Sequence, residues 1–340
     1  MSEHFDVAIV GGAAMGASTA WHLACDLGFA GRVLVIEKDP SYARAATALS
    51  ASSIRRQFST AINVRVSGYG VALLRDAPTR LGIDASFREG GYLFLATEAG
   101  RETLAANHAV QTGEGADVVW LDPPALTARF PWLALDGIAA GTWGRTGEGW
   151  FDGFGVMQAM RRASREAGVT WRTAEVAAIE VASGRTSGVR LADGTRIDAG
   201  TVIVTAGAWV TKLFPDLAAD LRTHRTAVVY LEPPADLREA WDAAPVILDV
   251  GGGTDGYIIP RSGEGGLKFG SGLHKRFSPD ADADRVPLGD EGWAILKLFS
   301  PPIARVEEYA VSEVVTCAYT FTQDGCFFGT QKGRCIVVSA

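Results

Sequence analysis

A glycine-rich turn near the start of the chain constrains the fold more than any other feature. The short apolar run at 5–10 (FDVAIV) predicts a buried strand and leads directly into Gly11-Gly12-Ala13-Ala14-Met15-Gly16. Residues 14–28 then predict a helix that Gly28 ends, and residues 32–36 (RVLVI) predict a second buried strand. A strand, a helix and a strand within forty residues predict a βαβ unit and a parallel sheet.

The same turn indicates a dinucleotide site. Gly11 and Gly16 match the first and third glycines of G-x-G-x-x-G, and Ala13 replaces the second. The first glycine permits the tight turn, and the third lets the helix pack close to the strand, so that a pyrophosphate meets the helix N-terminus. Glu37 ends the second strand, where a carboxylate accepts hydrogen bonds from ribose hydroxyls. The candidate cofactor-binding residues of this unit are Gly11, Gly12, Ala14, Met15, Gly16, Glu37 and Lys38.

Length and composition narrow the class of protein. A chain of 340 residues suggests two domains, or one with an insertion. The formal charge of -7 argues against non-specific binding of nucleic acid. No apolar stretch is long enough to span a bilayer, and four scattered cysteines predict no disulfide framework. We therefore expect a cytoplasmic protein with no metal site, since the histidines lack metal-ligand spacing.

Further strands predict a second, β-rich domain. Residues 201–205 and 335–338 continue the parallel sheet, and Asp193-Gly194 predicts a hairpin between 186–191 and 194–199. A helix is expected at 155–168. Other strands are expected at 226–232, 245–250, 256–260, 266–273 and 305–315. The predicted fold class is α/β. Its nucleotide domain is discontinuous (1–80, 150–215 and 325–340), and its substrate domain is mostly antiparallel (81–149 and 216–324).

Five motifs together resemble one known family. They are IVGGAAMGASTAWHLA near the start, Ser50–Phe58, Val204–Trp209, Gly270–His274 and Thr316–Thr320. In order and spacing they resemble the D-amino-acid-oxidase-like FAD-dependent oxidoreductases, especially the sarcosine oxidase and dimethylglycine dehydrogenase branch. The resemblance implies a Rossmann-like FAD-binding domain and oxidation of a small-molecule amine or amino acid, with a hydride equivalent passing to FAD from the carbon next to nitrogen.

The resemblance also implies roles for single residues. Cys317, in a Thr-Cys-Ala-Tyr-Thr context, would carry the flavin through a thioether. His274 and Arg55 would be catalytic, and Tyr257 and Arg261 are candidates to bind a substrate carboxylate. The remaining residues implied to contact the cofactor are Ser50, Ser53, Arg55, Val176, Ala206, Gly207 and Trp209.

Two alternatives remain at this level. In the family, the last strand continues into a Ser-Gly-His-Gly-Phe-Lys-type turn that covers the flavin, whereas this sequence ends at Ser339-Ala340. A degenerate or truncated flavin-binding protein without turnover is therefore one alternative, and an NAD-dependent dehydrogenase, which shares the βαβ unit, is the other. The sequence leaves open the exact substrate, the electron acceptor and the oligomeric state.

Overall fold

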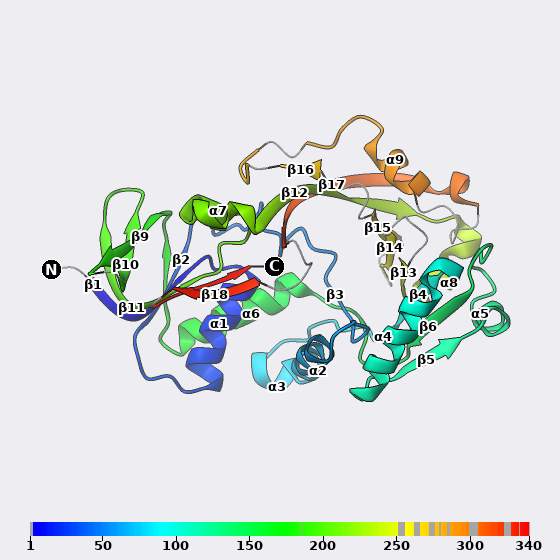
Figure 1. Ribbon diagram of the computed structural model, residues 1–340, viewed down its shortest axis with the longest axis horizontal. Helices are drawn as coiled ribbons and strands as arrows, with labels where there is room; N and C mark the ends of the chain where they lie inside the picture. The colour runs from blue at the N-terminus through cyan, green and yellow to red at the C-terminus, as the bar shows by residue number, and fades with distance from the viewer. Residues whose placement is uncertain are drawn as a thin grey trace.

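The computed structural model describes residues 3–339 except 184, 251–255, 262–265, 272–275, 279, 284–285, 299–304, 323–327 and 333. The chain forms two large sheets toward opposite ends of an elongated molecule, with helices packed against both (Figure 1). None of the helices in the described part of the chain has the length and apolar character that a membrane crossing requires.

The first sheet is built around β1 (Glu3–Val10), which pairs in parallel with β2 (Val33–Glu37) on one side and with β11 (Arg196–Val204) on the other. Consecutive residues of β1 from Val7 to Val10 face opposite sides of the sheet, as a pleated strand requires. The rest of the sheet consists of β8 (Thr170–Thr173), β9 (Val176–Ala182), β10 (Arg185–Leu191), β18 (Phe328–Lys332) and β19 (Cys335–Ser339). The βαβ unit and the parallel strand at the end of the chain are thus as predicted.

Helices cover one face of this sheet. α1 (Ala14–Trp21) packs against α6 (Gly153–Glu166), whose N-cap Asp152 accepts a hydrogen bond from Gly155 N–H. The helix predicted for 14–28 is α-helical only to Trp21. It continues as a π-helical turn (His22–Asp26), and Gly28 follows with a φ of +60°. The hairpin of β9 and β10 and the short helix α7 (Val210–Leu213) cover the opposite face.

The second sheet is mostly antiparallel, with one parallel pair between β4 (Tyr92–Ala96) and β13 (Val246–Val250). Leu93 and Leu95 point into its main core, whereas Tyr92 and Phe94 face the other way. The remaining strands are β5 (Val118–Leu121), β6 (Ala140–Gly144), β12 (Leu221–Glu232), β14 (Gly256–Pro260), β15 (Leu267–Ser271), β16 (Arg276–Phe277) and β17 (Ala310–Thr322).

β12 and β17 form a long pair along the second sheet, near the top in Figure 1. The strand predicted for 305–315 was placed too early, because Val306–Glu308 is a 3-10 turn and β17 extends to Thr322. Cys317 therefore lies inside a strand, opposite Thr226.

Shorter elements connect the two sheets. A two-stranded ribbon of β3 (Ser53–Ile54) and β7 (Gly149–Trp150) lies beside the wrapping segment, the name we give to residues 43–53. The other helices are α2 (Ala61–Arg75), α3 (Ala77–Leu81), α4 (Arg101–Gly113), α5 (Pro123–Arg129), α8 (Arg238–Asp242) and α9 (Glu291–Leu298).

Candidate cofactor and substrate site

The glycine turn after β1 is packed too tightly for side chains. Gly11 has a φ of +97°, and a Cβ built on it would lie 2.6 Å from Thr205 O. A Cβ on Gly16 would lie 1.9 Å from Gly11 O. The Thr205 hydroxyl donates to Gly11 O at 2.7 Å and fixes the turn to the end of β11. The close packing leaves the N-terminus of α1 facing a cavity, as a dinucleotide site requires.

Glu37 holds this turn in place through hydrogen bonds. Its carboxylate accepts hydrogen bonds from Gly12 N–H at 2.7 Å and from Asp39 N–H at 2.9 Å. A carboxylate has about four acceptor positions, so capacity remains for ribose hydroxyls. The predicted ribose ligand therefore also has a structural role that the sequence did not indicate.

A cavity of about 290 Å³ opens in front of the turn. Thr47 of the wrapping segment reaches into this region, and its hydroxyl accepts a hydrogen bond from Ala14 N–H at 3.2 Å. The cavity brings together most of the predicted cofactor residues with several that were not predicted. Its lining includes Gly11, Ala14, Met15, Glu37, Lys38, Arg44, Thr47, Thr205, Ala206, Gly207, Trp209 and Ala318. A smaller cavity of about 60 Å³ beside it is lined by Val176 with Lys38, Ala206 and Trp209.

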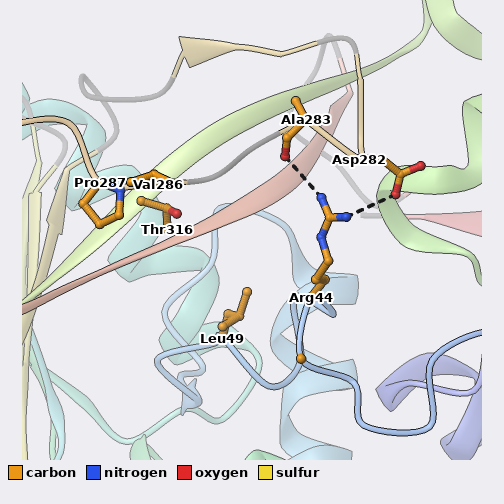
Figure 2. A pocket seen from close by; sticks show the side chains of 8 residues that line it. Arg44, Leu49, Asp282, Ala283, Val286, Pro287 and Thr316 are labelled. Atoms are coloured by element: carbon orange, nitrogen blue, oxygen red, sulfur yellow. Dashed lines mark hydrogen bonds and ion pairs between the residues drawn. The ribbon is translucent and has the colours of Figure 1, made fainter.

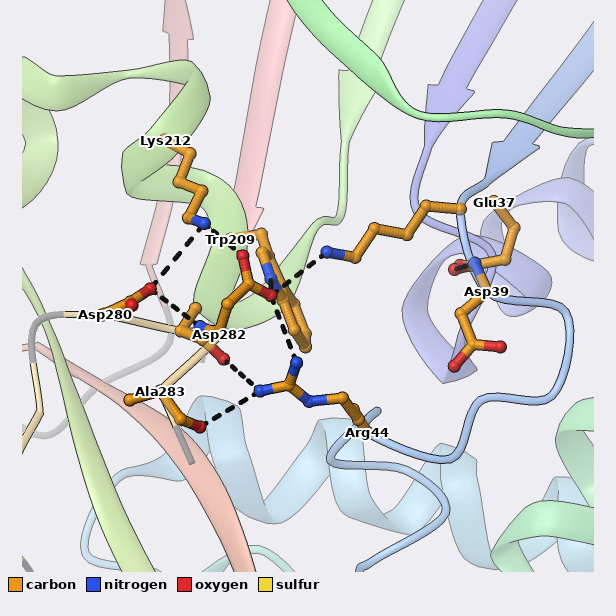
Figure 3. A network of polar contacts seen from close by, with 10 residues as sticks. Glu37, Asp39, Arg44, Trp209, Lys212, Asp280, Asp282 and Ala283 are labelled. Atoms are coloured by element: carbon orange, nitrogen blue, oxygen red, sulfur yellow. Dashed lines mark hydrogen bonds and ion pairs between the residues drawn. The ribbon is translucent and has the colours of Figure 1, made fainter. Parts of the chain in front are cut away.

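A network of charges borders the 290 Å³ cavity, which we call the nucleotide cavity (Figure 3). Asp282 accepts a hydrogen bond from Trp209 Nε1 at 2.7 Å and pairs with Lys212. Lys38 Nζ and Arg44 Nη1 each lie 3.5 Å from Asp282 Oδ1. The hydrogen bond from Lys212, followed by that from Trp209, holds the pKa of the Asp282 carboxyl well below its ordinary value. The network therefore joins the nucleotide cavity to residues 280–283.

Arg44 also lines a cavity of about 590 Å³, together with Asp282 and Ala283 (Figure 2). Its guanidinium donates to Ala283 O at 3.2 Å and to Ala281 O at 3.4 Å. Leu49 lines this cavity from the wrapping segment, and Thr316 lines it from β17. The wrapping segment is thus attached at Arg44 to the β-rich part of the molecule.

A fourth cavity, of about 200 Å³, is lined by three tyrosines and one arginine. Arg55 lies at its wall beside Tyr92, and Tyr257 and Tyr319 come from the second sheet. We call it the tyrosine cavity. Its other lining residues are Ser50, Ala51, Ser52, Ser53, Leu248 and Ile259.

The phenols of the tyrosine cavity are held in their neutral form. Desolvation raises the pKa of Tyr92, and it raises those of Tyr257 and Tyr319 far above the ordinary value for tyrosine. The Tyr92 hydroxyl shares a 2.8 Å hydrogen bond with Ser53 Oγ, and the Tyr319 hydroxyl interacts with Tyr257 and the Cys317 thiol. The cavity therefore carries a cation and several neutral hydroxyl groups.

Strand β17 carries both Tyr319, which lines the tyrosine cavity, and Cys317, the predicted flavin-bearing cysteine. Thr316 lines the 590 Å³ cavity together with Arg44, Ala318 lines the nucleotide cavity, and Tyr319 lines the tyrosine cavity. Cys317, 1% exposed, lies among them. Because alternate residues of a strand share a face, Cys317 and Tyr319 point to the same side of β17.

Comparison with known proteins agrees with this geometry. The family described as FAD dependent oxidoreductase (DAO) matches residues 6–337. The chain belongs to this family. The family is described as FAD-dependent, and its cofactor is FAD.

Individual relatives of the DAO family show the extent of the similarity. FAD-dependent oxidoreductase domain-containing protein 1 of Xenopus laevis is 41% identical over 175 residues, which cover 49% of this chain and 35% of that protein. The chain thus spans about a third of that curated relative's length. Glycine oxidase of Geobacillus kaustophilus is 26% identical over 273 residues, which cover 77% of this chain and 69% of that protein. The crystal structure of L-proline dehydrogenase from P. horikoshii shares the fold, with a TM-score of 0.84 at 21% identity, over 100% of this chain and 88% of that one.

Some residues implied by the DAO-family resemblance lie elsewhere. His274 lies outside the described residues. Arg261 does not line the tyrosine cavity but an adjoining cavity of about 530 Å³, together with Lys268 and Arg88. Arg56, to which the resemblance assigned no role, donates to the carbonyls of Glu114 and Gly115, which is a structural role.

Several site residues escaped the sequence analysis of this DAO-family chain. Tyr319 follows Cys317 by two positions in a strand, and this alternation could have indicated a shared face. Tyr92, Arg44 and Asp282 had no local signal, because the segments that bring them to the site are far apart in the chain.

Proposed function

We propose that the chain oxidises a small amine that bears a carboxylate: a secondary or N-methyl amino acid, or a D-amino acid. The observation that carries the proposal is the position of Arg55 at the wall of the tyrosine cavity. A guanidinium binds a carboxylate through two parallel hydrogen bonds and keeps its charge at any physiological pH. A cavity of about 200 Å³ is below the usual range for drug-sized ligands and suits a molecule of amino-acid size.

The charge of the cavity favours the reactive form of such a substrate. Among the described residues that line the tyrosine cavity, none is acidic and Arg55 is the cation. This environment attracts a carboxylate and offers no counter-ion to an ammonium group. The amine is therefore favoured in its uncharged form, whose lone pair supports loss of a hydride equivalent from the neighbouring carbon. The protonated phenols supply neutral hydrogen-bond donors around it.

The residues of the glycine turn fit the cofactor. We assign the pyrophosphate to the turn of Gly11 and Gly16, where a Cβ would collide with backbone oxygen, and the ribose to Glu37. Lys38, Val176, Ala206 and Trp209 would surround the adenosine end, and Ser50, Ser53 and Arg55 the flavin end. When bound, FAD supplies the two-electron acceptor for the amine. The protein's part is to position the substrate and exclude water.

An anaerobic screen of flavin bleaching over amino acids tests the proposal. We expect sarcosine, proline or a D-amino acid to bleach the flavin absorbance of the purified holoenzyme. We further propose that the chain divides into a nucleotide domain and a substrate domain, and that the protein is cytoplasmic. An intact spectrum with every amine offered would contradict the proposal and favour the alternative of a flavin-binding protein without turnover.

A further inference from the structure

Glu148 is a buried carboxylate behind the tyrosine cavity. Its side chain is 1% exposed. It accepts a hydrogen bond from Arg56 N–H at 2.5 Å and another from Gln57 Nε2 at 2.9 Å. A carboxylate buried this deeply loses its hydration, so its hydrogen bonds have to be well formed.

The structure is shaped around this carboxylate. A Cβ built on Gly144 of β6 would lie 1.9 Å from Glu148 Oε2, so only glycine leaves room for it there. Gln57 Nε2 also donates to Tyr92 O at 2.9 Å, and Thr142 donates its hydroxyl to Gln57 Oε1 at 2.7 Å. Thr142 and Gln57 are buried as well. The side chains of Glu148, Gln57 and Thr142, with Arg56 N–H, form a closed set of hydrogen bonds that we call the Glu148 network.

The Glu148 network ends at Arg55. Arg55 Nε donates to Gln57 O at 3.1 Å, and its guanidinium lies 4.6 Å from the centre of the Phe58 ring. Glu148 thus accepts hydrogen bonds from the backbone of Arg56 and from the side chain of Gln57, the two residues that follow Arg55. The backbone carbonyl that orients the guanidinium belongs to Gln57 itself.

We propose that Glu148 is a positioning residue: through Arg56 and Gln57 it aims the Arg55 guanidinium into the tyrosine cavity and so sets the preference for amines that carry a carboxylate. The inference rests on the proposed function, because it takes Arg55 as the group that binds the substrate carboxylate. Glu148 itself touches neither substrate nor cofactor.

The protonation of Glu148 gives the network a pH dependence. Burial, opposed by the hydrogen bonds from Gln57 and Arg56, raises the pKa of Glu148 to about 7. Above that pH the ionised carboxylate accepts both hydrogen bonds, whereas below it one oxygen becomes a donor and opposes the Gln57 amide. The charged groups around it are Arg55, Arg56 and Glu89, whose carboxylate accepts from Gly147 N–H and pairs with Arg75. The titratable group on β4 is Tyr92, which stays protonated.

The test compares matched amines on the holoenzyme. Sarcosine is paired with dimethylamine, and proline with pyrrolidine, which lack only the carboxylate. In Glu148→Gln at pH 8, we expect the apparent Kd for the amino acid in anaerobic bleaching to rise about tenfold, the scale of one well-formed charged hydrogen bond. The Kd for the amine without a carboxylate and the limiting bleaching rate should stay within about twofold of wild type. The reason is that the Glu148 network acts on Arg55, which binds only the carboxylate. Wild type should lose its preference as pH falls through 7, and Glu148→Gln should show no such step.

A ligand without an amine and a control variant separate a role of Glu148 in binding from a general loss of structure. Acetate, titrated against the flavin spectrum, should bind Glu148→Gln more weakly by a similar factor, and this needs no turnover. Glu102→Gln, an exposed carboxylate of α4, is the matched control and should behave as wild type. If Glu148→Gln does not fold, Thr142→Val, which keeps the shape of the side chain and removes its hydroxyl, should show a smaller shift of the same kind.

The outcomes distinguish failure of the positioning role of Glu148 from failure of the proposed function. An equal loss for both members of each amine pair, or no loss for either, overturns the positioning role. If wild type is bleached by no amine, the proposed function fails, and the acetate titration alone then decides the role of Glu148. An unchanged Kd for acetate in that case overturns the inference.

Discussion

Gly16 shows at the scale of one residue how the fold sets up the cofactor site. Its backbone lies so close to the turn that a Cβ would lie 1.9 Å from Gly11 O. That distance is well inside van der Waals contact, and the obstacle is backbone rather than a flexible side chain. Helix α1 would have to move away from β1 to relieve it, taking the helix N-terminus with it.

We expect Gly16→Ala to lose FAD while much of the fold remains. Flavin content per protein, read from the visible spectrum after purification, should fall at least about tenfold, since the pyrophosphate loses its backbone donors. Gly113→Ala, at the end of α4, is the control. It meets nothing within 4 Å and gains helix propensity of about 1 kcal/mol. Full flavin content in Gly16→Ala would show that the turn does not hold the cofactor.

The position of Cys317 predicts how the flavin is attached. It is buried between residues that line three different cavities, and it shares a face of β17 with Tyr319. We predict that the flavin is attached through its sulfur. Yellow colour should then remain with the protein after acid precipitation, and Cys317→Ser should release it to the supernatant. The buried Cys335 offers the matched control, Cys335→Ser. Release of the flavin from wild type under acid would contradict the attachment.

Among the elements, the segment around Asp282, between β16 and α9, is joined to the wrapping segment by the Asp282–Arg44 ion pair. Asp282 pairs with Lys38 and Arg44 from one side and with Lys212 from the other. The side chain is 37% exposed, so water and salt screen these pairs, and each contributes less than about 1 kcal/mol to the free energy of unfolding. The network therefore orders two segments more than it stabilises the whole fold.

Asp282→Asn should consequently change local opening more than global stability. We expect limited proteolysis within 43–53 or 280–283 to speed up several-fold, while the melting temperature shifts by only a few degrees. Raised salt should bring wild type closer to the variant, because it screens the same pairs. Equal proteolysis rates in low salt would mean that the network does not hold the segments together.

Elements differ in how well the sequence predicts them, for physical reasons. The βαβ unit and the hairpin at Asp193-Gly194 carry their signals locally, in glycines that need a positive φ and in apolar runs. The π-helical turn after Trp21 and the late start of β17 depend on packing between distant segments, and no local pattern announces them. The site divides in the same way. Gly11, Gly16 and Glu37 are local to one turn, whereas Arg55, Tyr92 and Tyr257 meet only in the folded chain.

At the scale of the whole molecule, Glu148 links stability to pH. Its folded pKa of about 7 lies above the ordinary value of 4.5, so folding takes up a proton between these values. Because the folded state then binds more protons, the free energy of unfolding falls as pH rises from about 4.5 to 7. Glu148→Gln should remove this contribution, which denaturant titrations at pH 5 and pH 8 would measure. An identical pH dependence in the variant would place the titration elsewhere.

We propose that Arg55 holds a substrate carboxylate while the amine is oxidised, and matched amines measure this role. Anaerobic bleaching of the flavin is followed with proline and with pyrrolidine, in wild type and in Arg55→Gln. We expect wild type to prefer proline strongly and Arg55→Gln to lose most of this preference, by about 100-fold for a bidentate ion pair. Equal preference in the two proteins, or no bleaching of wild type by any carboxylated amine, would contradict it.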